Sequence, residues 1–173
     1  MSTQVGKIQF SPKPWEAYMH LGIVHFMLFP ECIGGDGPVV ETAAKVAADD
    51  FFRVLEVRPV NDPDTAARLK ALADAAHLVI GVGGQPILLR GKPAIDQAYV
   101  FGARIMATLD GPGSYPGEAK KAAATERLAE SLKELCAYAK AKATDYTVFI
   151  SLETFDQTID KKSLMGPSKD AAK

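Results

Sequence analysis

Short apolar runs alternate along this chain with longer stretches in which apolar residues recur every three to four positions. Short apolar runs predict buried strands, and the longer period predicts amphipathic helices. Strands are predicted over residues 23–29, 54–60, 78–82, 103–109 and 146–152. Helices are predicted from Pro38 to about residue 51, from the turn at 61–64 to about residue 76, over 93–101, and from Glu118 to about residue 142.

This alternation of strands and helices predicts βαβ units around a parallel sheet. Right-handed crossovers place successive strands side by side. After the fifth strand, the run Pro167–Lys173 has only the signature of a cap and a first helical turn. A full (β/α)8 barrel needs about 250 residues. We therefore expect an α/β fold in which residues 1–173 form a single domain, the N-terminal part of an incomplete TIM barrel with about five strands and four helices.

Within the predicted strands, apolar residues share one face and polar residues the other. In the second strand, Leu55 and Val57 lie on one face, and Glu56 and Arg58 lie on the opposite one. The polar face also collects His25, Thr108, Asp110, Ser151 and Glu153. Helices cover both faces of an open doubly wound sheet, so unequal faces favour a barrel whose interior is polar. Because barrel enzymes work at the carboxyl ends of their strands, Glu56, Arg58 and Asp110 are predicted to bind substrate.

Glu153 ends the fifth predicted strand, where a carboxylate can ligate a hard metal ion or act as a general base. The alternative is a loop carboxylate that pairs with Lys161 or Lys162. For Arg58 the alternative is a structural ion pair with Glu56. His25 is predicted to be a buried core histidine.

The glycine-rich run 81–84 precedes Gln85 and Pro86, not the helix start that a dinucleotide-binding loop requires. It predicts a tight exit from the third strand.

Composition narrows the classes of partner. The 20 basic and 21 acidic residues give a net charge of −1, which provides no general attraction to nucleic acid or to an anionic membrane. No apolar run approaches the roughly 18–20 residues that span a bilayer. Two cysteines, Cys32 and Cys136, are too few for a disulfide framework and favour a reduced, cytoplasmic protein. Neither a nucleic acid nor a membrane is an expected partner.

The run from Leu152 to Ser168 contains a strand ending in Leu-Glu, a polar loop with Asp-Lys-Lys, and Leu-x-Gly-Pro before a predicted helix. This pattern resembles the xylose isomerase-like TIM barrels, the sugar isomerase/epimerase group that also includes sugar phosphate isomerases and endonuclease IV-like relatives. The Leu55-Glu56-Val57 strand and the Gly102-Ala103-Arg104 turn also resemble segments of that family.

The resemblance implies a divalent metal (Mn, Co, Mg or Zn) at the carboxyl ends of the strands. Glu153 matches the family's first metal-binding glutamate, which in the epimerases also takes part in proton transfer. The other family ligands, an Asp, a His and a second Glu, come from later strands, so this chain alone is expected to be inactive. The implied reaction moves a proton next to the carbonyl of a sugar or sugar phosphate through an enediolate, and Glu56 would contact a substrate hydroxyl.

Two other interpretations remain at this point. A flavodoxin-like α/β module would bind a small ligand or a partner protein where its strand order reverses. An endonuclease IV-like DNA-repair enzyme would share the barrel, although the near-neutral charge and the lack of clustered Lys and Arg disfavour it. Exposed strand edges favour self-association into a homo-oligomer.

Overall fold

The computed structural model describes residues 19–111 and 113–166, apart from the side chains of 85–90. Five parallel strands lie in chain order: β1 (Gly22–Val24), β2 (Val54–Val57), β3 (Val79–Pro86), β4 (Ile105–Leu109) and β5 (Phe149–Leu152). The helices are α1 (His25–Leu28), the 3-10 turn η2 (Pro30–Cys32), α2 (Val39–Ala47), α3 (Pro63–Ala75), α4 (Ile87–Phe101) and α5 (Glu118–Lys142). The helix start predicted at 167–173 lies outside the described residues.

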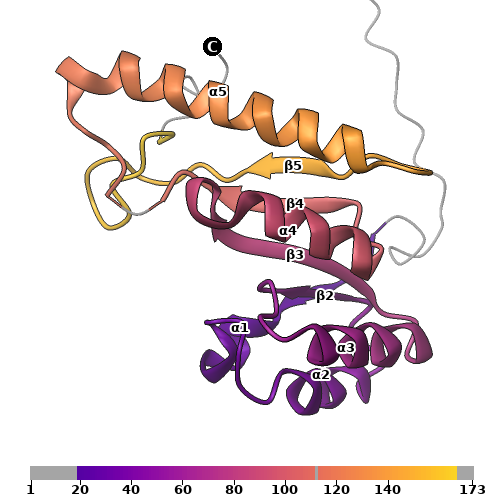
Figure 1. Ribbon diagram of the computed structural model, residues 1–173. Coiled ribbons are helices and arrows are strands. Elements are labelled where there is room, and N and C mark those ends of the chain that lie inside the picture. Colours follow the sequence, from indigo (N-terminus) through magenta and orange to yellow (C-terminus); the bar gives the residue numbers. More distant parts are fainter. Residues whose placement is uncertain (1–18, 112, 167–173) are drawn as a thin grey trace, which may run out of the picture.

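The strand order separates the two α/β alternatives. A flavodoxin-like sheet reverses its order between neighbouring halves, whereas this sheet runs β1-β2-β3-β4-β5 without reversal. Figure 1 shows β2, β3, β4 and β5 one beside the next in chain order. The order is that of a (β/α) barrel segment, and the flavodoxin-like interpretation is wrong.

The two faces of the sheet differ in burial. The face that packs on the helices is fully buried, and includes Leu55, Val57, Ile80, Val82 and Met106. On the other face, Val79, Ile105 and Phe149 are 54%, 55% and 71% exposed. In the described part of the chain, the helices therefore cover one face of the sheet and leave the inner face exposed.

The polar pattern misled the face assignment on β4. Thr108 and Asp110 were expected on the inner face, but both are buried together with Met106 on the helix side. The apolar Ile105 is exposed on the inner face instead. Asp110 tolerates burial because one carboxylate oxygen accepts a backbone N–H from Met165 at 2.8 Å. A buried polar group with a hydrogen-bond partner is not restricted to the solvent side.

The first strand is shorter than its apolar run. It ends at Val24, and His25 begins α1. The His25 side chain is 1% exposed and its Nε2 forms a 2.8 Å hydrogen bond with Thr42 Oγ1, which confirms the core histidine. Burial lowers the pKa of His25, against an opposing contribution from the negative charge of Glu31.

The third strand is longer than predicted. It continues through the glycines to Pro86 and pairs there with β4, with a register shift between Val82 and Gln85. Gly84 adopts φ +73° at this irregularity, a conformation that glycine reaches without strain. Helix α4 then begins at Ile87 and carries Pro93 inside it, so the predicted start at Pro93 is wrong.

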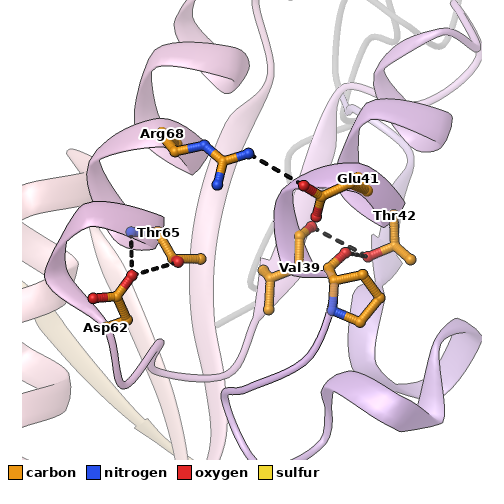
Figure 2. A network of polar contacts seen from close by, with 7 residues as sticks. Val39, Glu41, Thr42, Asp62, Thr65 and Arg68 are labelled. Atoms are coloured by element: carbon orange, nitrogen blue, oxygen red, sulfur yellow. Dashed lines mark hydrogen bonds and ion pairs between the residues drawn. The ribbon is translucent and has the colours of Figure 1, made fainter.

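Helices α2 and α3 pack side by side, as Figure 2 shows. Asp62 caps α3 by accepting hydrogen bonds from the backbone N–H and the hydroxyl of Thr65, at 2.8 and 2.6 Å. Arg68 on α3 bonds Glu41 on α2 at 3.1 Å. Because both of these side chains are largely exposed, the ion pair contributes little, and the buried contacts carry the packing.

The one-sided burial predicts different costs for the same substitution. Replacing Ile95, which is 0% exposed in α4, by alanine should lower the free energy of unfolding by about 2–5 kcal/mol. The same change at Ile105 should cost less than about 1 kcal/mol. Urea unfolding of both variants measures the difference. Equal costs would mean that the inner face of the sheet is covered in solution.

Candidate functional site

A cavity of about 590 Å³ lies at the carboxyl ends of the strands. Apolar side chains from β1, α1 and the loop after β5 form most of its wall, and Glu56, Arg58, Glu153 and Lys161 supply the charges. Figure 1 shows the connections after β4 and β5 at the end of the sheet to which the β5 arrow points. The volume is within the range of small-molecule sites.

Glu56 and Glu153 share this cavity although β3 and β4 separate their strands. Burial raises the pKa of Glu56, and the negative charge of Glu153 raises it further, while Arg58 acts in the opposite direction. The curved sheet therefore brings together two of the predicted site carboxylates, and the charge of Glu153 acts on Glu56.

The glycine run of β3 makes room for Glu56. A Cβ atom added to Gly83 would lie 2.0 Å from Glu56 Oε1 and 2.6 Å from its Cδ. A Cβ added to Gly81 would lie 3.9 Å from Glu56 Cγ, an ordinary contact. The segment predicted to be a tight strand exit is thus the surface on which the Glu56 carboxylate lies.

Arg58 is held over an aromatic ring at the same cavity. Its Cζ lies 4.5 Å from the centre of the Phe26 ring, a cation–π arrangement. Gly84 permits this approach, because a Cβ there would lie 2.8 Å from Phe26 Cζ and 3.0 Å from Arg58 Cζ. The guanidinium is therefore preorganised beside Glu56.

The loop after β5 is built around Asp156. Its carboxylate accepts the backbone N–H groups of Ile159, Asp160 and Lys161 at 2.7, 2.9 and 3.1 Å. These hydrogen bonds, that of Lys161 above all, lower the pKa of Asp156. The Lys161 ammonium forms an ion pair with Asp160 at 3.0 Å. This loop closes one side of the cavity in a defined conformation.

Asp110 does not join the other three predicted site residues. Its Oδ2 accepts the backbone N–H of Met165, and Ser114 Oγ nearby accepts that of Leu164 at 2.9 Å. Asp110 therefore anchors the segment that follows the β5 loop, and it lines a separate hollow beside α5. The structure places Glu56, Arg58 and Glu153 together and gives Asp110 an anchoring position.

The metal implied by the resemblance requires several protein ligands. Over residues 19–111 and 113–166, no group of three or more His, Cys, Asp or Glu side chains is placed to hold a metal ion. The cavity contributes the carboxylates of Glu56 and Glu153. The described residues do not complete a metal site, so no reaction step is derived through one.

The cavity at the carboxyl ends of in-order parallel strands defines the architecture of a (β/α)-barrel site. No family model matches the chain, and no curated protein matches its sequence. The structure is similar to the crystal structure of a D-tagatose 3-epimerase-like protein, with a TM-score of 0.62 and 15% sequence identity. The match covers 83% of this chain and 55% of that one, so the chain spans about half the length of this neighbour.

The comparison confirms the expected fold, an incomplete (β/α) barrel. The structure also bears on the expected absence of a membrane span and on the expected reduced cysteines. In the described part of the chain, no helix combines the length and the apolar character needed to cross a membrane. Cys32 and Cys136 are both free thiols, the first buried and the second exposed.

Gly83→Ala should displace the Glu56 carboxylate, because the added methyl group overlaps it. Because the overlapped atoms are the far end of a flexible side chain, we expect a loss of stability below about 1 kcal/mol. We also expect a weaker affinity for any ligand that contacts Glu56. Gly81→Ala is the matched control, and it should leave both nearly unchanged. Thermal melting measures the stability, and ligand titration measures the affinity. Equal melting temperatures and affinities for the two variants would contradict the placement of the Glu56 carboxylate against Gly83.

Glu56→Gln should make the protein more stable at neutral pH. The folded pKa of Glu56 is raised above the ordinary value of 4.5, so the wild type loses stability as the pH rises through that pKa, and glutamine does not. Below pH 4.5 the advantage of the variant should disappear. The urea unfolding midpoints of the wild type and of Glu56→Gln, compared from below pH 4.5 to neutral pH, measure this difference in stability.

The gain should shrink in a Glu153→Gln background, because that change removes one of the charges that raise the Glu56 pKa. A gain of the same size in both backgrounds would show that the two carboxylates do not interact.

Proposed function

We propose that this chain forms the N-terminal, five-stranded part of a barrel enzyme that isomerises or epimerises a small sugar or sugar phosphate. The observation that carries the proposal is that Glu56 and Glu153 line one cavity at the carboxyl ends of the strands. The name of the structural neighbour, a D-tagatose 3-epimerase-like protein, supports the same reaction class. The free thiols are compatible with the cytoplasmic location that we propose.

In this proposal, Glu153 acts as the general base. Its carboxylate removes the proton from the carbon next to the substrate carbonyl, and the electron pair of that C–H bond forms a carbon–carbon double bond. The carbonyl oxygen becomes the negatively charged oxygen of an enediolate. Return of the proton from Glu153 to the neighbouring carbon gives the isomer, provided that the hydroxyl proton of the enediolate passes to the negatively charged oxygen, so that the new carbonyl forms. The epimer requires a proton donor on the opposite face of the same carbon, and Glu153 is regenerated when it releases its proton to solvent.

The remaining cavity residues have roles that suit this chemistry. The Arg58 guanidinium, held over Phe26, is the cation that would stabilise the enediolate oxygen. Glu56 would hydrogen-bond a substrate hydroxyl. Phe26 and Phe155 in the wall offer apolar surface to the C–H groups of a sugar ring or chain. The near-neutral charge of the chain disfavours the endonuclease alternative.

Exchange of the substrate proton next to the carbonyl with deuterium from solvent tests the role of Glu153 as general base. Because this chain alone is expected to be inactive, the assay uses the whole barrel, in which later strands follow this segment. The barrel is incubated with D-fructose or D-tagatose in D₂O, and the loss of the proton signal next to the carbonyl is followed by NMR. We expect exchange faster than in buffer alone, and Glu153→Gln should slow it by about a hundredfold or more. Glu126→Gln, the same change at an exposed position of α5, is the matched control and should leave the rate unaltered.

Two results would overturn the proposal. The first is exchange in the presence of the wild-type whole barrel that is no faster than in buffer. The second is a Glu153→Gln variant that exchanges as fast as the wild type, which would remove Glu153 from the role of base.

A further inference from the structure

The segment Lys161–Met165 is held from two sides. The backbone N–H of Ser163 donates to the carbonyl of Asp156 at 2.8 Å, and the Phe155 N–H donates to the Met165 carbonyl at 3.0 Å. From the side of β4, Ser114 and Asp110 accept the next two backbone N–H groups. The backbone of this segment is therefore fixed against both the β4 loop and the β5 loop.

Ser163 is the residue of this segment at which hydrogen bonding is incomplete. Ser163 lines the cavity together with Glu153 and Phe155, and it is 0% exposed. Among the residues whose side chains the structure describes (19–84, 91–111 and 113–166), its hydroxyl has no hydrogen-bond partner. Buried hydroxyl groups almost always have a partner, because an unsatisfied one keeps the cost of its lost hydration.

The neighbouring serine provides a contrast. The Ser114 hydroxyl accepts the backbone N–H of Leu164 at 2.9 Å, so it has an evident structural role. Ser163 contributes nothing comparable through its side chain, although its position is fixed by the surrounding hydrogen bonds. A rigidly placed hydroxyl without an internal partner at a cavity wall is preorganised for a partner that arrives with the ligand.

We propose that the Ser163 hydroxyl binds an oxygen of a polyol ligand in this cavity, next to Glu153. A serine hydroxyl can donate one hydrogen bond and accept others, which matches the equally dual hydroxyl groups of a sugar. The inference rests on the proposed function, because it assigns a binding residue to the same cavity.

The experiment compares Ser163→Ala with Ser114→Ala in the full chain. D-fructose and D-tagatose are titrated and their dissociation constants measured by NMR chemical-shift changes, and the melting temperature of each variant is recorded. Ser163→Ala should weaken binding roughly three- to tenfold and leave the melting temperature unchanged or higher. Ser114→Ala should lower the melting temperature, because the Leu164 N–H loses its acceptor.

Each outcome decides a separate point. If wild type and Ser163→Ala bind the ketoses equally, the assignment of Ser163 is wrong and the proposed function stands. If Ser163→Ala melts at a lower temperature, as Ser114→Ala should, the hydroxyl is structural and the assignment is wrong. If the wild type binds neither ketose, the proposed function and the assignment both fall.

Discussion

The pairing of five parallel strands in chain order is the constraint on which the rest of the structure depends. Parallel strands place their carboxyl ends at one edge, so residues that follow different strands converge there. Right-handed crossovers place the helices on one face, and the strands then have one buried and one exposed face. The cavity, its charges and the exposed inner face all follow from this arrangement.

The cavity has an energetic cost that the fold accommodates. Placing the Glu56 carboxylate in a half-buried position beside Glu153 raises its pKa, which means that the ionised form is disfavoured by the folded state. Gly83 leaves the space for this carboxylate, and the Arg58 charge partly offsets the repulsion. An unfavourable charge in a cavity is typical of a functional site, where stability is exchanged for chemistry.

Polar residues outside the cavity give the site its rigidity. Asp110 and Ser114 accept backbone N–H groups from the segment after β5, and Asp156 accepts three from its own loop. These acceptors hold a loop without regular secondary structure in one conformation beside Glu153. Asp110, Ser114 and Asp156 carry carboxylates or a hydroxyl. From residue type alone, such a group could serve in catalysis as well as in backbone hydrogen bonding.

The sequence by itself determined the α/β class, the five strands, the helix Glu118–Lys142 and the joint position of Glu56, Arg58 and Glu153, because hydrophobic period and strand parity are local properties. Only the tertiary structure decided the face on which Asp110 lies and the end of the first strand at Val24. It also decided that Gly83 leaves space for the Glu56 carboxylate and that the Ser163 hydroxyl is unsatisfied. Each of these depends on contacts between segments far apart in the chain. A local pattern carries no record of such contacts, and hydrogen bonding allows a polar residue to occupy either face.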